Sequence, residues 1–363
     1  MKSAYIHIPF CHSICSYCDF CKLYDNKVWI KKYLASLELE IKEKYHNEAL
    51  DTIYIGGGTP SCLSIESLKQ LFLSLNILKK SPQIEFTFEC NIEDINLEKI
   101  KILKNNGVNR ISIGVQSFIP KNIKLLNRHH TKEEVFEKIK LLKENGFENI
   151  NIDLIYAIPG ETIEDLEYDL NCFLELDIAH ISTYSLIIEE NTKLFIDGYT
   201  EVDEELDLEM YKLINQKLSN YHHYEISNFA KPKYESKHNL TYWNNDSYYG
   251  FGLSAVGYDG MYRYSNTRNL NKYLAGNWLQ EKRVVDETEK IENEFILGFR
   301  KIDGINIEKF NQKYNIDLDT LKMVSKLINE GKLIKNGNYI KISDDYIYTS
   351  NDILVEFIGG NYE

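Results

Sequence analysis

The sequence predicts an α/β protein, a partial (β/α)6 barrel followed by a C-terminal winged-helix-like α+β domain. Two observations predict it. From Ala4 to about Leu186, short apolar runs alternate with amphipathic helical patterns at short intervals, which is typical of a parallel sheet with helices outside it. From Asp286 onward, helical patterns are followed by a pair of short strands and a last helix.

Six apolar runs are expected to form the barrel strands, because a helical pattern follows each of them. Six units are fewer than the eight of a closed barrel, so the barrel is expected to be partial. The expected strands are Ala4–Ile8, Thr52–Ile55, Glu85–Glu89, Arg110–Val115, Asn149–Ile155 and His180–Leu186. In such barrels the chemistry gathers where the strands end, so polar residues there are candidates for a site.

Helical patterns lie between the strands, at Trp29–Tyr45 and Leu68–Leu75 among others. Thr131 and Glu134 have the spacing of a capping box at the start of another helix. Gly146 is expected just past the end of that helix, where glycine adopts the left-handed conformation at little cost.

Three regions are predicted: a barrel at 1–200, a barrel extension at 201–285 and the C-terminal domain at 286–363. A Gly- and Tyr-rich stretch from about Gly250 to Tyr273 is expected to pack over the open side of the barrel. The C-terminal elements are expected at Ile291–Phe299, Ile307–Tyr314, Leu321–Asn329, Lys332–Lys335, Tyr339–Ile342 and from about Asn351.

Composition narrows the classes of function. The 363 residues carry a net charge of −13, and an acidic surface repels phosphate backbones, so nucleic acid is not an expected partner. No stretch has the length and apolarity of a membrane span, and no signal peptide is recognised. Seven cysteines, an odd number, indicate a reducing compartment rather than a disulfide framework. The expected location is the cytoplasm.

Three cysteines, Cys11, Cys15 and Cys18, share one short loop at the spacing C-x3-C-x2-C. Thiolates hold iron–sulfur clusters, and three of them leave one iron without a protein ligand. A zinc site is an alternative, with Cys21 or His12 as the fourth ligand. A redox pair at the C-x-x-C spacing is another.

The loop resembles the cysteine motif of the radical S-adenosylmethionine (SAM) superfamily, C-x3-C-x-aromatic-C, with Tyr17 at the aromatic position. The resemblance implies a [4Fe–4S] cluster on Cys11, Cys15 and Cys18, with the amino and carboxylate groups of SAM on the fourth iron. Cys21 is then interpreted as a bystander thiol, because a thiolate at the open iron would exclude SAM.

A run of three glycines, Gly56-Gly57-Gly58, follows the second expected strand and precedes Thr59. Glycines let the backbone approach a ligand closely, although such a run alone is as often a turn as a site. Beside the cysteine loop, it resembles the GGE-type segment of radical SAM proteins, which hydrogen-bonds the amino group of SAM.

Four polar residues lie at or near strand ends. Glu89 ends the third strand and is either a SAM contact or a solvated cap. Gln116 follows the fourth strand, and Arg128 is suited to clamp a carboxylate. Asp153 lies in an apolar strand and needs a partner, which is either the ribose hydroxyls of SAM or an arginine, Arg128 or Arg110.

Five segments together resemble the oxygen-independent coproporphyrinogen III oxidase (HemN-like) family, which contains HemN-type oxidases and HemW-type haem chaperones. The segments are Tyr5–Cys11, Gly56–Ser61, Gly114–Phe118, Asp153–Thr162 and Tyr224–Ala230. The similarity covers essentially the whole chain. The residues that it places at SAM are Tyr5, Tyr17, Phe20, Gly57, Gly58, Thr59, Glu89, Gln116, Arg128 and Asp153.

Three features favour the HemW-type branch. The oxidases have a further cysteine at the position of Phe20, and they carry an extended segment before the cluster, whereas four residues precede Tyr5. His238-Asn239-Leu-Thr-Tyr242-Trp243 matches the H-N-x-x-Y-W motif of the haem chaperones. Histidine can ligate haem iron, and Tyr and Trp offer flat apolar area. The alternative is that His238 hydrogen-bonds locally and the aromatic rings are core.

The resemblance therefore implies a haem chaperone that binds a [4Fe–4S] cluster, SAM and haem, and passes haem to acceptor apoproteins, expected in the respiratory chain. The rival is a radical SAM enzyme that oxidatively decarboxylates the propionate side chains of coproporphyrinogen III. A radical enzyme that modifies haem and a plain zinc or thiol protein are more distant alternatives.

Overall fold

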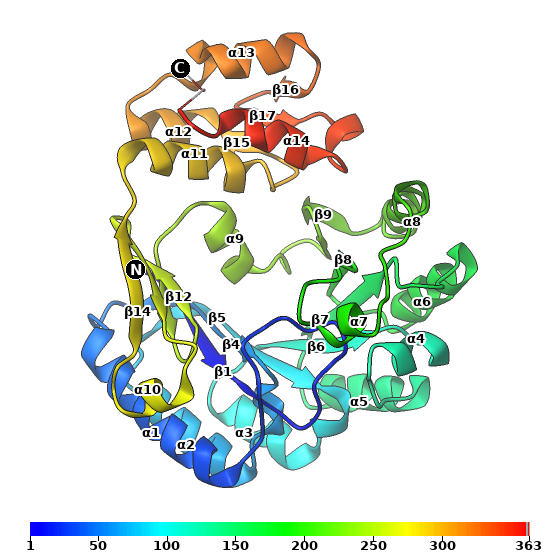
Figure 1. The fold of residues 1–363 in the computed structure, drawn as a ribbon, viewed down its shortest axis with the longest axis vertical. Coiled ribbons are helices and arrows are strands. Elements are labelled where there is room, and N and C mark those ends of the chain that lie inside the picture. Colours follow the sequence, from blue (N-terminus) through cyan, green and yellow to red (C-terminus); the bar gives the residue numbers. More distant parts are fainter. Residues whose placement is uncertain (361, 363) are drawn as a thin grey trace.

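The computed structural model describes residues 1–360 and 362. Its centre is a twelve-stranded sheet in the order β14-β13-β12-β11-β1-β4-β5-β6-β7-β8-β10-β9. The strands from β11 to β8 are parallel and curve into a partial barrel (Figure 1). Their bounds are β11 Tyr248–Phe251, β1 Ser3–Ile8, β4 Leu50–Gly57, β5 Lys80–Asn91, β6 Arg110–Gln116, β7 Asn149–Tyr156 and β8 His180–Ser185. All six predicted strands are confirmed.

Helices cover the outer face of the sheet, as predicted (Figure 1). They are α1 Lys27–Lys44, α2 Ile65–Leu75, α3 Leu97–Asn105, α4 Pro120–Leu125, α5 Lys132–Glu144, α6 Ile163–Glu175 and α8 Glu204–Lys217, with the short α7 Lys193–Ile196 near the strand ends. The capping box of Thr131 and Glu134 is confirmed at the start of α5. Gly146, with φ +79°, follows that helix. One core of apolar residues joins α1, α2, α3, α5, α6 and α8 to the sheet, while α4 and α7 contribute Leu125 and Leu194 to a smaller apolar cluster.

Antiparallel strands extend both edges of the parallel sheet. On one side lie β12 Val256–Tyr258, β13 Tyr262–Asn266 and β14 Leu279–Val284, and on the other β10 Asn228–Ala230 and β9 His222–Glu225. The expectation that residues 250–273 pack over the open side of the barrel is therefore wrong. Instead, β11 pairs with the otherwise free edge of β1, with Gly250 opposite Tyr5, and β12 to β14 continue from it.

A buried carboxylate fastens this extension to α1. Glu40 is fully buried and accepts hydrogen bonds from the Gly252 amide at 2.9 Å, the Asn266 amide at 2.6 Å and the Tyr273 hydroxyl at 2.6 Å. The Lys44 ammonium group also donates a hydrogen bond to the Glu40 carboxylate at 2.8 Å. A buried charge is tolerated only when it is paired and hydrogen-bonded in this way, so the network fixes the extension against the helix.

The C-terminal region has a separate apolar core, drawn from residues 291–362. It contains α11 Glu287–Gly298, β15 Ile305–Asn306, α12 Ile307–Tyr314, α13 Lys322–Asn329, β16 Leu333–Asn336, β17 Tyr339–Ile342 and α14 Ser350–Leu354. The predicted hairpin is confirmed, and β15 adds a third strand. The winged-helix-like pattern is thus present, while the three predicted region boundaries stay predictions.

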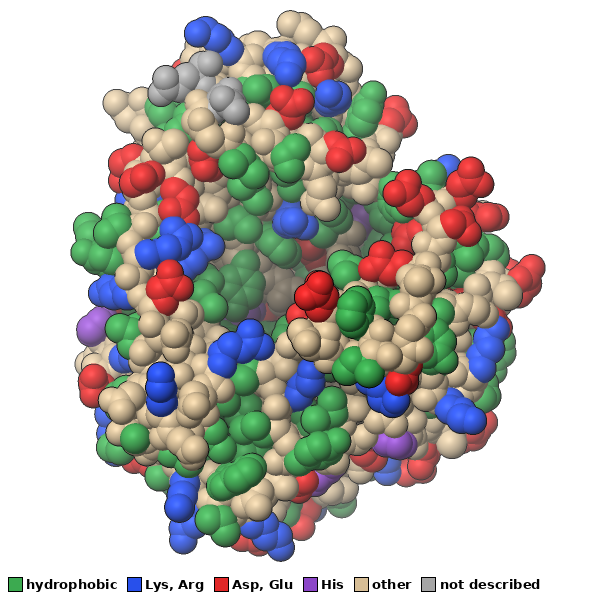
Figure 2. Space-filling view, in the orientation of Figure 1, with side chains coloured by type: hydrophobic (Ala, Val, Ile, Leu, Met, Phe, Trp, Pro, Cys, Tyr) green, Lys and Arg blue, Asp and Glu red, His purple; other side chains and the backbone are tan. Residues whose placement is uncertain are grey.

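The space-filling view shows a hollow between the C-terminal region at the top and the partial barrel below it (Figure 2). Acidic side chains gather on the arm formed by α8, whose first turns contain Glu204, Glu205 and Asp207 (Figure 2). Within residues 1–360 and 362, every helix is too short or too polar to cross a bilayer.

Candidate functional site

A cavity of about 150 Å³ lies where the parallel strands end and the cysteine loop crosses them. It brings together residues that are far apart in the sequence. The lining residues that the sequence predicted are Cys11, Cys15, Tyr17, Cys18, Phe20, Gly57, Gly58, Thr59, Glu89, Gln116, Arg128 and Asp153. Tyr5 is the one predicted SAM residue outside this lining.

The cysteine loop is closed at its base by a short parallel pair, β2 Phe10–Cys11 and β3 Leu23–Tyr24. Its middle is fastened by backbone hydrogen bonds of Ser16, whose N–H donates to Leu126 O at 3.2 Å and whose carbonyl accepts from Leu194 N–H at 3.0 Å. Tyr17 packs against a small apolar cluster that includes Leu126 and Leu194. The loop is therefore held to the barrel before any cofactor is considered.

Each thiol of the loop meets a different environment. The Thr59 hydroxyl donates to Cys11 Sγ at 3.5 Å, and Arg128 Nη1 donates to Cys15 Sγ at 3.4 Å. Burial raises the pKa of the Cys11 thiol to about 11, against the hydrogen bond from Thr59, and burial also raises the pKa of Cys18. Because metal ligands must be deprotonated, cluster binding would displace these protons.

Cys21 is the one cysteine of the loop that lies outside the lining of this cavity. Its side chain is partly buried against the main core and does not line the cavity. Its carbonyl oxygen lies 2.8 Å from His7 Nε2, and His7 Nδ1 lies 2.9 Å from the Tyr5 hydroxyl. Tyr5 is therefore connected to the loop through His7 and lies outside the cavity lining.

The glycine run brings the end of β4 against the cysteine loop. A Cβ added to Gly58 would lie 2.9 Å from Cys11 Sγ and 2.8 Å from the Pro9 carbonyl carbon, and one added to Gly57 would lie 2.4 Å from His7 Nδ1. Gly57 also has a φ of +116°, which other residues rarely adopt. The glycines are therefore required by close approach of backbone to loop.

Glu89 at the end of β5 is tied into this approach. One carboxylate oxygen accepts the Tyr54 hydroxyl at 2.7 Å and the other accepts the Gly57 amide at 3.0 Å. Burial raises the pKa of Glu89 to about 7, although the bond from Tyr54 opposes the shift. A carboxylate on the cavity wall provides an acceptor for a ligand ammonium group.

Gln116 has a strained backbone conformation, and Arg128 brings a positive charge to the site. Gln116 has a φ of +73°, and its buried Oε1 has no hydrogen-bond partner within the described residues. Non-glycine residues in this conformation cluster at functional sites. Arg128 donates to Asn91 Oδ1 at 3.0 Å and to the Gly114 carbonyl. The guanidinium is therefore held in place beside Cys15.

Asp153 on β7 has a neutral partner. Asn151 Nδ2 donates to its Oδ1 at 2.9 Å, and burial raises its pKa. Within the described residues, no ion pair joins it to Arg128 or Arg110. The internal arginine pair that the sequence left open is therefore absent there.

Several lining residues escaped the sequence reasoning, among them Asn91, Ser112 and Gly114. They follow from strand geometry, because alternate residues of a strand share one face. Asn91 lies two positions after Glu89 on β5, and Ser112 and Gly114 alternate with Gln116 on β6. A period-two count from Glu89 and Gln116 would have found them.

The predicted haem residues His238, Asn239, Tyr242 and Trp243 all lie on one short helix, α9 Lys237–Trp243. His238 is 1% exposed, with Nδ1 2.7 Å from Thr52 Oγ1 and Nε2 2.9 Å from the Tyr242 hydroxyl. Burial lowers its pKa to about 3, so the imidazole is neutral. Both ring nitrogens are thus engaged within the protein, the arrangement expected of a local hydrogen-bonder.

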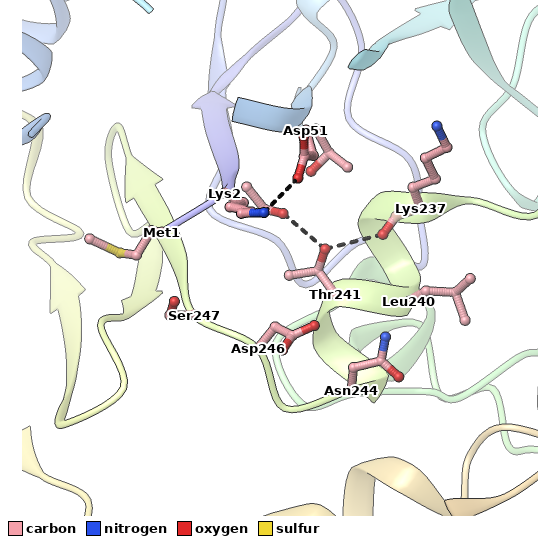
Figure 3. A pocket seen from close by; sticks show the side chains of 11 residues that line it. Met1, Lys2, Asp51, Lys237, Leu240, Thr241, Asn244, Asp246 and Ser247 are labelled. Carbon is pink, nitrogen blue, oxygen red and sulfur yellow. Dashed lines mark hydrogen bonds and ion pairs between the residues drawn. The ribbon is translucent and has the colours of Figure 1, made fainter. Parts of the chain in front are cut away.

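A groove of about 660 Å³ lies beside α9 (Figure 3). Lys237, Leu240, Thr241 and Asn244 line it, and Thr241 bonds the Ser3 hydroxyl at 2.9 Å. The four predicted haem residues are not in this lining. Trp243 instead lies under the Arg300 guanidinium, 5.7 Å from the ring centre. The groove and the motif therefore use different faces of the helix.

Comparisons with known proteins show to which family the chain is similar. Residues 5–172 match the radical SAM superfamily, and residues 285–345 match the HemN C-terminal domain. The heme chaperone HemW of Bacillus subtilis is 40% identical over 99% of this chain and 100% of its own length. HemW of Lactococcus lactis is 41% identical over 98% of this chain and 97% of its own.

A solved structure shares the fold. The coproporphyrinogen III oxidase HemN of Escherichia coli, described as a radical SAM enzyme, superposes with a TM-score of 0.86 at 22% identity, over 99% of this chain and 90% of HemN. Fold and site thus define a radical SAM protein. The chain belongs to the HemN-like family of that superfamily, on the branch of the HemW haem chaperones.

Proposed function

We propose that this protein is a haem chaperone, which binds haem, a [4Fe–4S] cluster and SAM and transfers haem to acceptor proteins. The observation that carries the proposal is the match over essentially the whole chain to proteins named heme chaperone HemW. We also propose a cytoplasmic location, because all seven cysteines are free thiols and such thiols persist in reducing compartments.

The cavity residues fit a cluster with SAM beside it. Cys11, Cys15 and Cys18 would hold three irons, and the wall opposite them carries donors and acceptors for an amino acid. When bound, the cluster supplies an electron and an open iron for the amino and carboxylate groups of SAM. The unpartnered Gln116 Oε1 supports the fit, since a buried polar atom without a partner is costly unless a ligand completes it.

The roles of the wall residues follow from their charges. The Glu89 carboxylate would accept a hydrogen bond from the amino group of SAM, the glycine run would enclose that group, and the Arg128 guanidinium would pair with the carboxylate of SAM. The Asp153 carboxylate would accept ribose hydroxyls. Tyr17 and Phe20 line the same cavity and would add apolar contact. Tyr5 would act through His7 as a positioning residue.

We place haem at α9, where the motif is found. His238 would reach iron by exchanging its bond to Thr52 or Tyr242, since both ring nitrogens are engaged. Tyr242 and Trp243 are half-buried and would offer ring surface to the porphyrin, and Asn239 adds a polar group on the same helix.

The proposed function predicts stable haem binding without porphyrin turnover. Anaerobically purified protein mixed with haemin is expected to keep its Soret band through gel filtration. The same preparation, reduced and supplied with SAM and coproporphyrinogen III, is expected to form no 5′-deoxyadenosine coupled to decarboxylation. Porphyrin turnover by protein that retains no haem would reject the chaperone in favour of the oxidase.

The oxidase is the second candidate, because the same cavity residues would hold the cluster and the SAM that the oxidase reaction uses. The two assays are run side by side on one preparation, with iron content measured first, so that loss of the cluster is not mistaken for lack of activity.

A conservative variant tests the place of His238. Tyr242→Phe removes the hydroxyl that occupies His238 Nε2 and keeps the ring. If the imidazole must leave that bond to reach iron, the variant is expected to bind haemin about fivefold more tightly, because a hydrogen bond contributes about 1 kcal/mol. Haemin titration followed in the Soret band measures it. If the haemin affinity and the spectrum are unchanged, His238 is not the ligand of the haem iron.

A further inference from the structure

A second, larger groove lies at the far edge of the sheet from α8, between the end of α1 and the antiparallel extension. Its volume is about 900 Å³, within the roughly 300–1,000 Å³ of small-molecule and cofactor sites. Residues 43–48, which span the end of α1 and the segment after it, line one side, and residues of β11, β13 and β14 line the other. Figure 1 shows these strands at the left, close to the N-terminus and well away from the cysteine loop.

Aromatic rings form much of the lining. Tyr249 and Trp278 are 1% and 8% exposed and belong to the main core, while Tyr262 and Tyr264 are half-buried at the surface. Ring faces of this kind favour contact with flat aromatic molecules. Lysine ammonium groups lie over three of these rings, Lys44 over Tyr264 and Trp278 and Lys282 over Tyr262. A planar ligand would therefore reach the rings by displacing these flexible side chains.

Two possible iron ligands face the same groove, His46 and Met261. His46 is exposed, and in the described part of the chain neither of its ring nitrogens has a hydrogen-bond partner. Met261 is 56% exposed. Its backbone is fixed by Asp259, which accepts from the Met261 amide at 2.9 Å. His with Met is an established ligand pair for haem iron.

The charges of the groove suit a ligand with carboxylates. Lys282 lies 4.1 Å over the Tyr262 ring and, within residues 1–360 and 362, has no acidic partner. Two of the three acids in the lining are engaged, since Glu48 accepts from Tyr249 at 2.7 Å and Asp259 accepts backbone amides, while the third, Glu43, is exposed. A propionate at Lys282 would therefore meet an unpaired cation.

We propose that this groove binds haem, with His46 and Met261 as ligands of the iron and Lys282 at a propionate. The proposal rests on the proposed haem-chaperone function and names a second place where haem contacts the chain. His46 is the more available ligand, since among the described residues its ring nitrogens have no hydrogen-bond partner, whereas those of His238 are engaged. An open groove at a sheet edge also leaves haem accessible to an acceptor protein.

The test uses full-length anaerobic protein and haemin, with metal-free protoporphyrin IX as a second probe. His46→Ala and Met261→Leu are each expected to weaken haemin binding by about tenfold and to shift the Soret maximum, because one axial ligand is lost. Added imidazole is expected to restore the wild-type spectrum of His46→Ala. Protoporphyrin affinity is expected to change little, because it has no iron to ligate.

His222→Ala is the matched control, since His222 is also exposed but lies outside this groove; it is expected to bind haemin as the wild type does. If haemin affinity and the Soret spectrum are unchanged in both His46→Ala and Met261→Leu, the proposal that this groove binds haem is rejected. The proposed chaperone function would not be affected by that result. Wild-type protein that retains no haemin would instead overturn the chaperone function. Thermal melting of each variant, expected to match the wild type for these exposed residues, shows that a loss of binding is not a loss of fold.

Discussion

Cys15→Ser is expected to reduce bound iron and acid-labile sulfide to background in anaerobically reconstituted protein. Cys15 lines the cavity with Cys11 and Cys18, and Arg128 contacts its sulfur at 3.4 Å. A serine hydroxyl does not replace a thiolate as an iron ligand, and two remaining thiols hold a cubane weakly. Iron and sulfide analysis, together with the visible absorption of the cluster, measures the loss.

Two other cysteines serve as controls for this variant. Cys172 lies on α6 and is 2% exposed. The Cys172→Ser variant is expected to leave the iron content unchanged. Cys21→Ser is also expected to keep the cluster, because its side chain lies outside the cavity lining. Full iron content in Cys15→Ser would reject the assigned ligands, and loss of iron in Cys21→Ser would mean that the fourth iron is not open to SAM.

Glu89→Gln is expected to remove a large pH dependence of stability. In the wild type, burial raises the pKa of Glu89 from the usual 4.5 to about 7. Between these two pH values the folded protein keeps a proton that the unfolded chain releases, so stability falls as the pH rises. The free energy of unfolding of the wild type, relative to Glu89→Gln, is expected to drop by about 3 kcal/mol across this window and to stay level above it.

Urea unfolding of SAM-free protein at several pH values measures this difference. The comparison with Glu89→Gln cancels the other buried acids, such as Glu225, whose pKa burial raises to about 7 as well. Glu66→Gln, at an exposed helix start, is the control and is expected to follow the wild-type profile. Parallel profiles of wild type and Glu89→Gln would show that Glu89 does not titrate in this range.

SAM binding should follow the opposite trend. The Glu89 carboxylate is a stronger acceptor for the amino group of SAM when it is ionised, so SAM affinity is expected to rise as the pH passes about 7. Glu89→Gln should bind SAM about tenfold more weakly at high pH, because hydrogen bonds to charged groups contribute about 1.5–3 kcal/mol.

Much of the cavity was predictable from local pattern. The cysteine spacing, the glycine run and the polar residues at strand ends lie where a parallel sheet places the ends of its strands, and all of them line one cavity except Tyr5. The strands themselves follow from apolar runs bounded by turns. The side-chain alternation that adds Asn91 and Ser112 is equally local, although it was not used.

The haem residues could not be judged in the same way. The sequence alone suggests that His238 is an available ligand. In the structure its Nδ1 is hydrogen-bonded to Thr52, which is 186 residues away in the chain. The pairing of β11 with β1 likewise joins segments that are far apart in the sequence. For this reason the stretch from about Gly250 to Tyr273 was expected over the open side of the barrel rather than in the sheet. Hydrogen bonding between distant segments leaves no periodic signal in either of them.

The sequence by itself determined the class of chemistry, because the thiol spacing and strand-end polar groups are set by residues close together in the chain. Only the tertiary structure decided which histidines are available. Packing places both ring nitrogens of His238 in hydrogen bonds, one with Thr52 and one with Tyr242. It also brings His46 and Met261 to one groove. The physical reason is that availability depends on burial and on partners, and both are supplied by distant parts of the fold.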